Sequence, residues 1–71
     1  MSGRECCRIL SQNGFSEVRR KGSHIQMQRK TINEFGFATL TVTVPDHKEL
    51  RIGTLAKIIA RSQLPRSLFE T

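Results

Sequence analysis

The chain has 71 residues, which is enough for one small domain. Twelve Lys and Arg residues face six Asp and Glu residues, giving a formal net charge of +6. So short a chain buries too little apolar surface to enclose a deep substrate cavity, so we expect any active site to lie on an exposed surface. The basic excess predicts attraction to nucleic acid or to an acidic protein; the alternative is that it serves solubility alone.

Several classes of site and segment find no support in the sequence. Cys6 and Cys7 are adjacent, so a disulfide between them would be strained, and no Cys or His cluster has zinc-ligand spacing. We therefore expect neither a metal nor a cofactor. The chain opens without a signal-peptide pattern and has no apolar run near the ~20 residues of a membrane span. These features predict a cytoplasmic protein without membrane contact.

The first predicted element is a helix over Gly3–Asn13. Ser2 and Glu5 have the spacing of a capping box, and Gly14 can adopt the left-handed conformation that ends a helix. Helical spacing places three apolar residues on one side, namely Cys6, Ile9 and Leu10.

A hairpin is predicted next. Phe15–Arg20 reads as a strand whose main apolar members are Phe15 and Val18, and its imperfect alternation allows a bulge. The turn Lys21-Gly22-Ser23 leads into a second strand, His24–Arg29, which alternates cleanly. One side of this strand should face the core through Ile25 and Met27, and the other should carry His24, Gln26 and Gln28.

The third strand is predicted over Phe37–Val44, after a polar loop over Lys30–Gly36, and Pro45 should end it. Its alternate residues should face the core (Leu40, Val42 and Val44) or extend the polar face (Thr39, Thr41 and Thr43).

After a connecting loop over Asp46–Arg51, Gly53-Thr54 opens a second predicted helix, with Thr54 as candidate N-cap and Pro65 as terminator. The apolar stripe of this helix comprises Ile52, Leu55, Ile58 and Ile59. Ser67–Glu70 suggests a further short turn. The order α-β-β-β-α predicts a single α+β domain over residues 1–71, in which two helices cover one face of a three-stranded antiparallel sheet.

Several short motifs occur together in this order: Gly22-Ser23-His24, Thr43-Val44-Pro45-Asp46-His47, and Gly53-Thr54-Leu55 followed by Lys57-Ile58-Ile59. From about Cys7 to Leu64 the chain resembles the HicA toxin family, also called YcfA-like. The resemblance implies a fold similar to a double-stranded-RNA-binding domain and an mRNA interferase activity that does not need the ribosome. It also implies that His24 is the catalytic histidine, and that the partner is a HicB antitoxin in a toxin–antitoxin hetero-oligomer.

The chain departs from the family pattern in two places. The connection over Lys30–Gly36 is longer than the family's usual one, and Ser62-Gln63-Leu64 stands where the family commonly has a small residue and Gly. The first departure is expected to affect contacts with substrate or partner, and neither touches the Gly-Ser-His motif.

The residues near His24 suit RNA cleavage. RNA carries its own nucleophile, the 2′-hydroxyl, and an imidazole is suited to remove its proton. Cationic side chains would stabilise the charged phosphorane. The candidates for RNA binding or electrostatic support are Arg20, Lys21, Ser23, Arg29 and Lys57. No carboxylate cluster suggests a two-metal site, so we expect metal-independent cleavage. The alternative for His24 is an ordinary surface histidine.

Two assignments and the function itself have alternatives. His47 would either donate the leaving-group proton or buttress the turn after Pro45 through a backbone hydrogen bond, and the second reading is preferred. Lys57 and Arg61 would contact phosphates or form a solvated helix face. The competing functions are a non-catalytic RNA-binding module of similar fold and a protein-interaction domain with an acidic partner.

Overall fold

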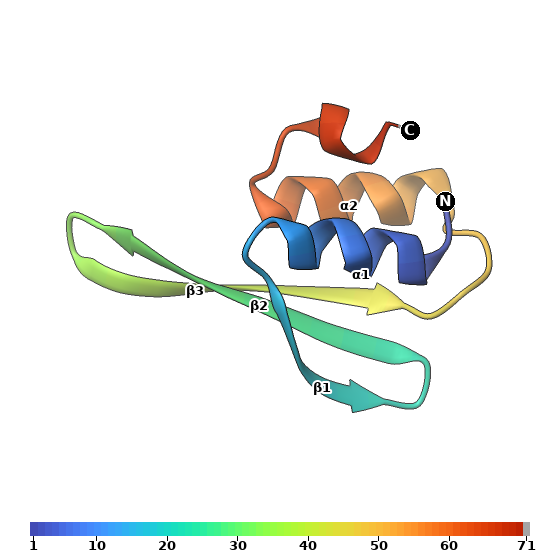
Figure 1. Cartoon of the computed structure of the whole chain (residues 1–71), viewed down its shortest axis with the longest axis horizontal. Coiled ribbons are helices and arrows are strands. Elements are labelled where there is room, and N and C mark those ends of the chain that lie inside the picture. The colour runs from blue at the N-terminus through green and yellow to red at the C-terminus, as the bar shows by residue number, and fades with distance from the viewer. Residues whose placement is uncertain (71) are drawn as a thin grey trace.

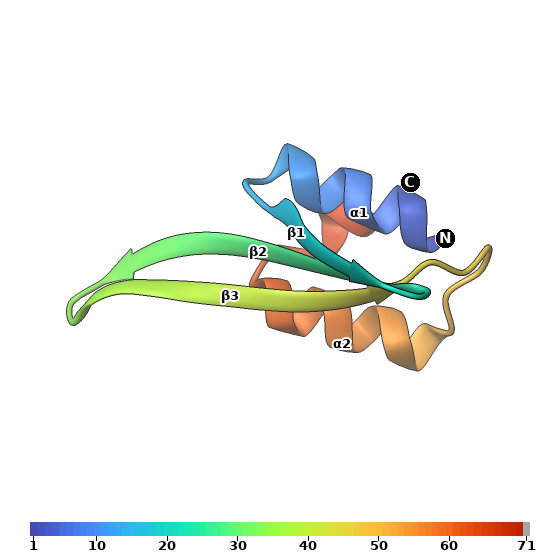
Figure 2. The ribbon, with the colours of Figure 1, turned by 90° about the horizontal axis from the view of Figure 1, so that it is seen from below.

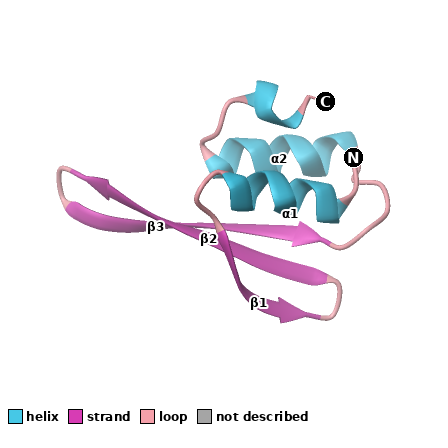
Figure 3. Cartoon of the chain, viewed as in Figure 1, coloured by secondary structure: helices cyan, strands magenta, loops and turns pink. Residues whose placement is uncertain are grey.

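The computed structural model describes residues 1–70 and confirms the α+β prediction. Its elements are α1 (Gly3–Gln12), β1 (Ser16–Lys21), β2 (His24–Asn33), β3 (Gly36–Pro45), α2 (Ile52–Ser62) and the short 3₁₀ helix η1 (Arg66–Phe69). The antiparallel strands lie in the order β1-β2-β3. Both α-helices lie on the same side of the sheet (Figures 1 and 3). Within the described part of the chain, no helix is long and apolar enough to cross a membrane.

The predicted capping box begins α1. The Glu5 backbone N–H donates to Ser2 Oγ at 3.0 Å, and the Ser2 N–H donates to Glu5 Oε1 at 3.2 Å. These bonds satisfy backbone donors that a helix N-terminus otherwise leaves free. The start of α1 also contacts the loop after β3, because the Gly3 N–H donates to the His47 carbonyl at 2.9 Å.

The core lies between the two helices and one face of the sheet. Its buried members come from every element except β1: Cys6, Ile9, Leu10, Phe15, Ile25, Met27, Val42, Val44, Leu50, Ile58, Ile59 and Phe69. Leu40 packs against this cluster while partly exposed. Burial raises the pKa of the Cys6 thiol to about 12. Cys6 is thus a neutral core residue, as predicted.

The predicted bulge occurs in β1. The pairing of β1 with β2 shifts between Glu17 and Arg19, so that Val18 has no direct partner. Val18, one of the two main apolar residues of the predicted strand, is 51% exposed and lies outside the core. Beyond the bulge, Arg19 pairs with Gln26 and Lys21 pairs with His24.

The predicted loop over Lys30–Gly36 is wrong. β2 continues to Asn33 and β3 begins at Gly36, with only Glu34 and Phe35 between them. The Phe35 N–H donates to the Asn33 side chain at 2.8 Å, and Gly36 has φ +114°. Side-chain capping of the turn and a glycine at positive φ thus replace the loop. The resulting β2–β3 ribbon extends beyond β1 and both helices (Figures 1 and 2).

The second helix begins earlier and ends earlier than predicted. Its N-cap is Arg51, so Thr54 lies inside its first turn and Ile52, which is 88% exposed, is not a core residue. It ends at Ser62, and Gln63 then adopts the left-handed conformation (φ 59°). The buried Ser62 hydroxyl donates to the Ile59 carbonyl and accepts from the Leu64 N–H at this end. The predicted terminal turn is η1, which buries Phe69.

Candidate functional site

The side of the sheet opposite the helices is uncovered, and we call it the open face. Gln26 pairs with Thr43, and Gln28 pairs with Thr41 and donates to its hydroxyl at 3.2 Å. Because paired residues of an antiparallel ladder share a face, the predicted polar face is confirmed. It carries His24, Gln26, Gln28, Lys30 and Ile32 from β2, and Phe37, Thr39, Thr41 and Thr43 from β3.

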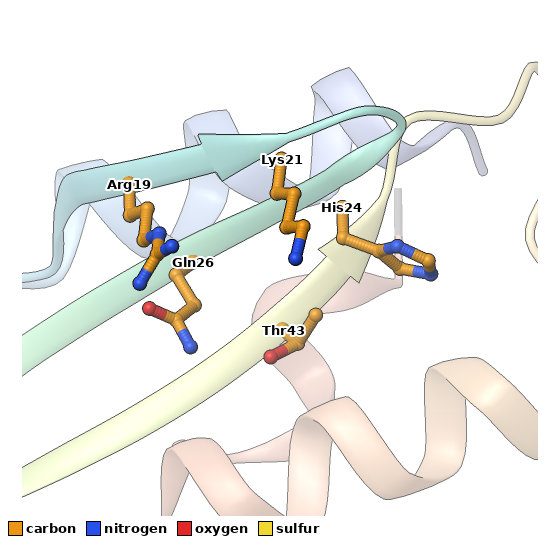
Figure 4. Close-up of a pocket in the computed structure, with 5 residues that line it drawn as sticks. All are labelled: Arg19, Lys21, His24, Gln26 and Thr43. Carbon is orange, nitrogen blue, oxygen red and sulfur yellow. The ribbon is translucent and has the colours of Figure 1, made fainter.

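One end of the open face is hollowed around His24. This hollow, which we call the His24 hollow, has a volume of about 260 Å³ and is open to solvent. Figure 4 shows its lining, which comes from all three strands: Arg19 and Lys21 on β1, His24 and Gln26 on β2, and Thr43 on β3. It therefore combines one imidazole with two cations and two neutral hydrogen-bonding groups, and no carboxylate lines it. Among residues 1–70, no three His, Cys, Asp or Glu side chains gather to hold a metal ion.

Arg19 is the residue of this hollow that sequence reasoning missed. Alternation from Lys21 back along β1 places Arg19 on the same face as Lys21, and Arg19 pairs with Gln26. The signal that could have identified Arg19 is the pairing of Lys21 with His24. This pairing shows that Lys21, and with it Arg19 two residues earlier, lies on the same face of the sheet as His24.

Arg20 lies on the other side of the sheet, since it pairs with the core residue Ile25. Its guanidinium forms an ion pair with Asp46, which Arg4 Nε also contacts at 3.4 Å. The Asp46 N–H in turn donates to the Ser23 carbonyl at 2.6 Å. The Asp46 side chain is only 14% exposed. Arg20 thus helps to join β1 to the end of β3, and it does not line the His24 hollow.

The Arg20–Asp46 pair predicts a loss of stability in acid. Arg20 lowers the pKa of Asp46 below its ordinary value of 3.8. A carboxyl whose pKa is lowered by folding stabilises the fold above its unfolded pKa, and this stabilisation disappears as pH falls through the lowered value. We expect urea midpoints of the wild type to fall below about pH 4. The matched Asp46→Asn variant should be less stable near neutral pH and lose less on acidification; equal pH dependence in the two proteins would contradict this role.

Arg29 and Ser23 also lie outside the His24 hollow. Arg29 pairs with Leu40 and belongs to the helix-bearing side of β2, where a Cβ built on Gly14 would lie 3.3 Å from its side chain. Ser23 occupies the turn before β2, and its backbone carbonyl accepts the Asp46 N–H. Neither residue is among those that line the His24 hollow.

His47 is separated from His24. It lines a different hollow, together with Pro45, Glu49, Leu50, Arg51 and Thr54. Its backbone carbonyl accepts the Gly3 N–H at 2.9 Å. This bond involves the His47 backbone and not its imidazole.

Lys57 lies beside a third hollow, of about 310 Å³, between β3 and α2. This hollow is also lined by Arg61 and by Thr43, and Thr43 borders the His24 hollow as well. Lys57 and Arg61 therefore continue the basic surface from Arg19 and Lys21 across the end of β3.

A comparison with protein families agrees with these motifs. The model described as HicA toxin of bacterial toxin–antitoxin matches residues 3–64, a span that includes all three strands, both α-helices and the Gly22-Ser23-His24 motif. No curated protein matches the chain significantly. The family match covers most of the chain and confirms the resemblance drawn from the sequence. The chain therefore belongs to the HicA toxins of bacterial toxin–antitoxin systems, in which a toxin is paired with an antitoxin.

Proposed function

We propose that the protein is an mRNA interferase, an endoribonuclease that cleaves mRNA without the ribosome and uses His24 as its general base. The observation that carries this proposal is the His24 hollow, where an exposed imidazole shares an open surface with Arg19 and Lys21. The net charge of +6 attracts RNA to such a surface. Because the site is not enclosed, a long polymer can reach it without threading into the protein.

The reaction needs two proton transfers: one removes the proton of the 2′-hydroxyl, and the other protonates the leaving 5′-oxygen. The His24 imidazole takes the proton of an RNA 2′-hydroxyl, and the 2′-oxygen attacks the adjacent phosphorus. The bond from phosphorus to the 5′-oxygen then breaks, and that oxygen receives a proton from the His24 imidazolium or from water. The products are a 2′,3′-cyclic phosphate and a 5′-hydroxyl. His47 has no part in these steps, because it lines a separate hollow.

Arg19 and Lys21 provide the electrostatic part of the mechanism. Both project from β1 over the same end of the open face as His24 (Figure 4). Cations fixed beside the phosphorane stabilise its additional negative charge more than they stabilise the ground state. Lys57 and Arg61 on α2 are placed to hold a neighbouring phosphate of the same strand.

The activity is tested with an unstructured oligoribonucleotide, its DNA counterpart and EDTA. The purified protein should cleave the RNA and leave the DNA intact, since DNA lacks the nucleophile. The lining of the His24 hollow includes no carboxylate, so EDTA should leave the rate unchanged. Equal cleavage of DNA, or no cleavage of any RNA under conditions in which the toxin arrests growth, would overturn the proposal.

Arg19→Ala should lower kcat/KM for RNA cleavage by about 10-fold to 100-fold, because one cation beside the developing phosphorane charge is lost. Arg29→Ala is the matched control: it removes the same charge from β2 on the helix-bearing side. We expect the control to keep kcat/KM within about threefold, with the small loss due to general electrostatic attraction. Equal losses in the two variants would show that only net charge matters.

Neutralisation is assigned to a HicB-type antitoxin. Two modes of inhibition stay open: direct cover of His24, and blockade of the basic residues around it. A complex in which His24 remains accessible to RNA would exclude the first mode.

A further inference from the structure

The β2–β3 ribbon ends in three exposed apolar side chains. Ile32 is 72% exposed, Phe35 is 91% exposed and Phe37 is 85% exposed. Ile32 and Phe37 are cross-strand partners, and Phe35 lies in the turn next to them. Single exposed apolar residues are common, but three such side chains at one tip, including two aromatic rings, indicate a contact surface.

The register places part of this tip on the same face as His24. The pairing of β2 with β3 runs without a shift from His24 to Asn33, so alternate residues keep one side of the ladder throughout. Ile32 and Phe37 therefore belong to the open face, at its far end. Ile32 lies eight residues from His24 on one strand, about 26 Å at roughly 3.3 Å per residue.

The surface between the two ends is hollowed and hydrophilic. Beyond the His24 hollow lies a further depression of about 360 Å³, lined by Gly14, Ser16, Val18, Gln28 and Lys30. Lys30 is exposed and comes directly before Ile32 in the alternation of the open face. The register thus places amides, hydroxyls and a lysine on the open face between His24 and the Phe37 ring. Figure 2 shows the course of the β2–β3 ribbon that carries them.

The order of side chains along the open face suits the binding of single-stranded RNA. Arg19, Lys21 and Lys30 complement the negative backbone, and an exposed aromatic ring stacks on an unpaired base of any identity. Glu34, which lies in the turn, disfavours a phosphate at the tip itself. If RNA occupies this face, a base is therefore better suited to the tip than a phosphate is. A basic protein partner is disfavoured by the same charges, and an acidic one would be attracted to the lysines more than to the tip.

We propose that Phe37 is a base-stacking platform, and that the open face from His24 to Phe37 is one extended track for single-stranded RNA. The inference rests on the proposed function, because it treats the RNA held there as the strand cleaved at His24. Ile32 supports the Phe37 ring from the neighbouring strand, and Lys30 binds the phosphate that precedes the stacked base. The extension of the hairpin lengthens the substrate contact beyond the cleavage site.

A single introduced tryptophan tests the stacking directly, because the chain contains no Trp and no Tyr. Phe37→Trp and the matched control Ala38→Trp place an indole at neighbouring residues of β3, on opposite faces of the ribbon. Both are made in a His24→Ala background, so that RNA is bound without being cleaved. An unstructured RNA of about 12 nucleotides should quench the fluorescence of Phe37→Trp and leave that of Ala38→Trp nearly unchanged. Equal quenching in both variants, or none in either, would overturn the proposal.

Affinity provides a second measurement that does not depend on the tryptophan. Phe37→Ser in the same background should weaken binding of the RNA of about 12 nucleotides by roughly 5-fold to 100-fold. It should leave unchanged the binding of an RNA of about 4 nucleotides, which occupies only the His24 end. Unchanged affinity for the longer RNA would contradict the proposed RNA track. If antitoxin binding were lost at the same time, the exposed tip would be a contact surface for the antitoxin. Cleavage by the wild type is scored separately, so failure of the proposed function and failure of the track give different results.

Discussion

Replacement of His24 by alanine is expected to lower the rate of RNA cleavage by about 100-fold to 10,000-fold, the usual worth of a positioned general base. The His24 side chain is exposed and contributes nothing to the core, so the variant should keep its circular dichroism spectrum and thermal midpoint. RNA affinity should fall little, because Arg19 and Lys21 remain in place. Single-turnover cleavage of labelled RNA separates the chemical step from binding.

His47→Ala is the matched control for this experiment, since it removes the other histidine of the chain. It should cleave RNA within about threefold of the wild-type rate, because His47 lines a different hollow from His24. Loss of a proton donor that acts in the reaction would lower the rate far more. An expressed His24→Ala protein that still cleaves RNA and arrests growth would refute the assignment of the base. A large loss in His47→Ala, with the fold intact, would instead indicate a two-histidine site.

Gly3→Ala is expected to destabilise the fold by about 3 kcal/mol, although it replaces a poor helix former with the best one. A Cβ on Gly3 would lie 2.0 Å from the Pro45 carbonyl oxygen and 3.2 Å from Asp46 Cα. These are backbone atoms, so neither can rotate away. To relieve this clash, α1 would have to move away from the end of β3, which would strain the hydrogen bond from the Gly3 N–H to the His47 carbonyl. The thermal midpoint should fall by roughly 10–20 °C, as calorimetry or circular dichroism would show.

Gly53→Ala is the corresponding control, because Gly53 also lies in the first turn of a helix but a Cβ there meets no atom within 4 Å. It should leave the free energy of unfolding unchanged or raise it by up to about 1 kcal/mol, as expected from helix propensity. If both glycine variants were equally stable, the close approach of α1 to β3 would not be a constraint on the fold.

Much of the fold was predictable because the local sequence patterns of its helices and strands agree with the pattern of residues that are buried in the core. The capping box at Ser2 and Glu5 and the alternation of the second and third strands each predict one structure. The ribbon tip was mispredicted because Lys30–Gly36 is polar on average, and composition cannot reveal that Asn33 caps a two-residue turn. The predicted start of α2 differs from the observed one because Thr54 is a good N-cap by residue type, whereas the N-cap is Arg51, which makes no side-chain capping hydrogen bond.

The site was only partly predictable for a related reason. The position of His24 on the open face follows from the alternation of polar and apolar residues along β2, which can be read from the sequence. Arg20 and Arg29 were chosen by proximity in the chain, but on a strand the neighbouring residue points to the opposite face. The partner of Arg20 is Asp46, 26 residues away in the sequence, and local sequence patterns do not reveal such a long-range pair.

The chemistry of the RNA ends tests the central claim most directly. Mass spectrometry of the fragments that the wild-type protein produces in EDTA should find 2′,3′-cyclic phosphate and 5′-hydroxyl ends, and a single 2′-deoxy substitution at the cleaved position should abolish that cut. This result follows if the His24 imidazole activates the 2′-hydroxyl of the substrate. Products that carry 3′-hydroxyl and 5′-phosphate ends, or continued cleavage at the 2′-deoxy position, would mean that water is the nucleophile and would contradict the mechanism.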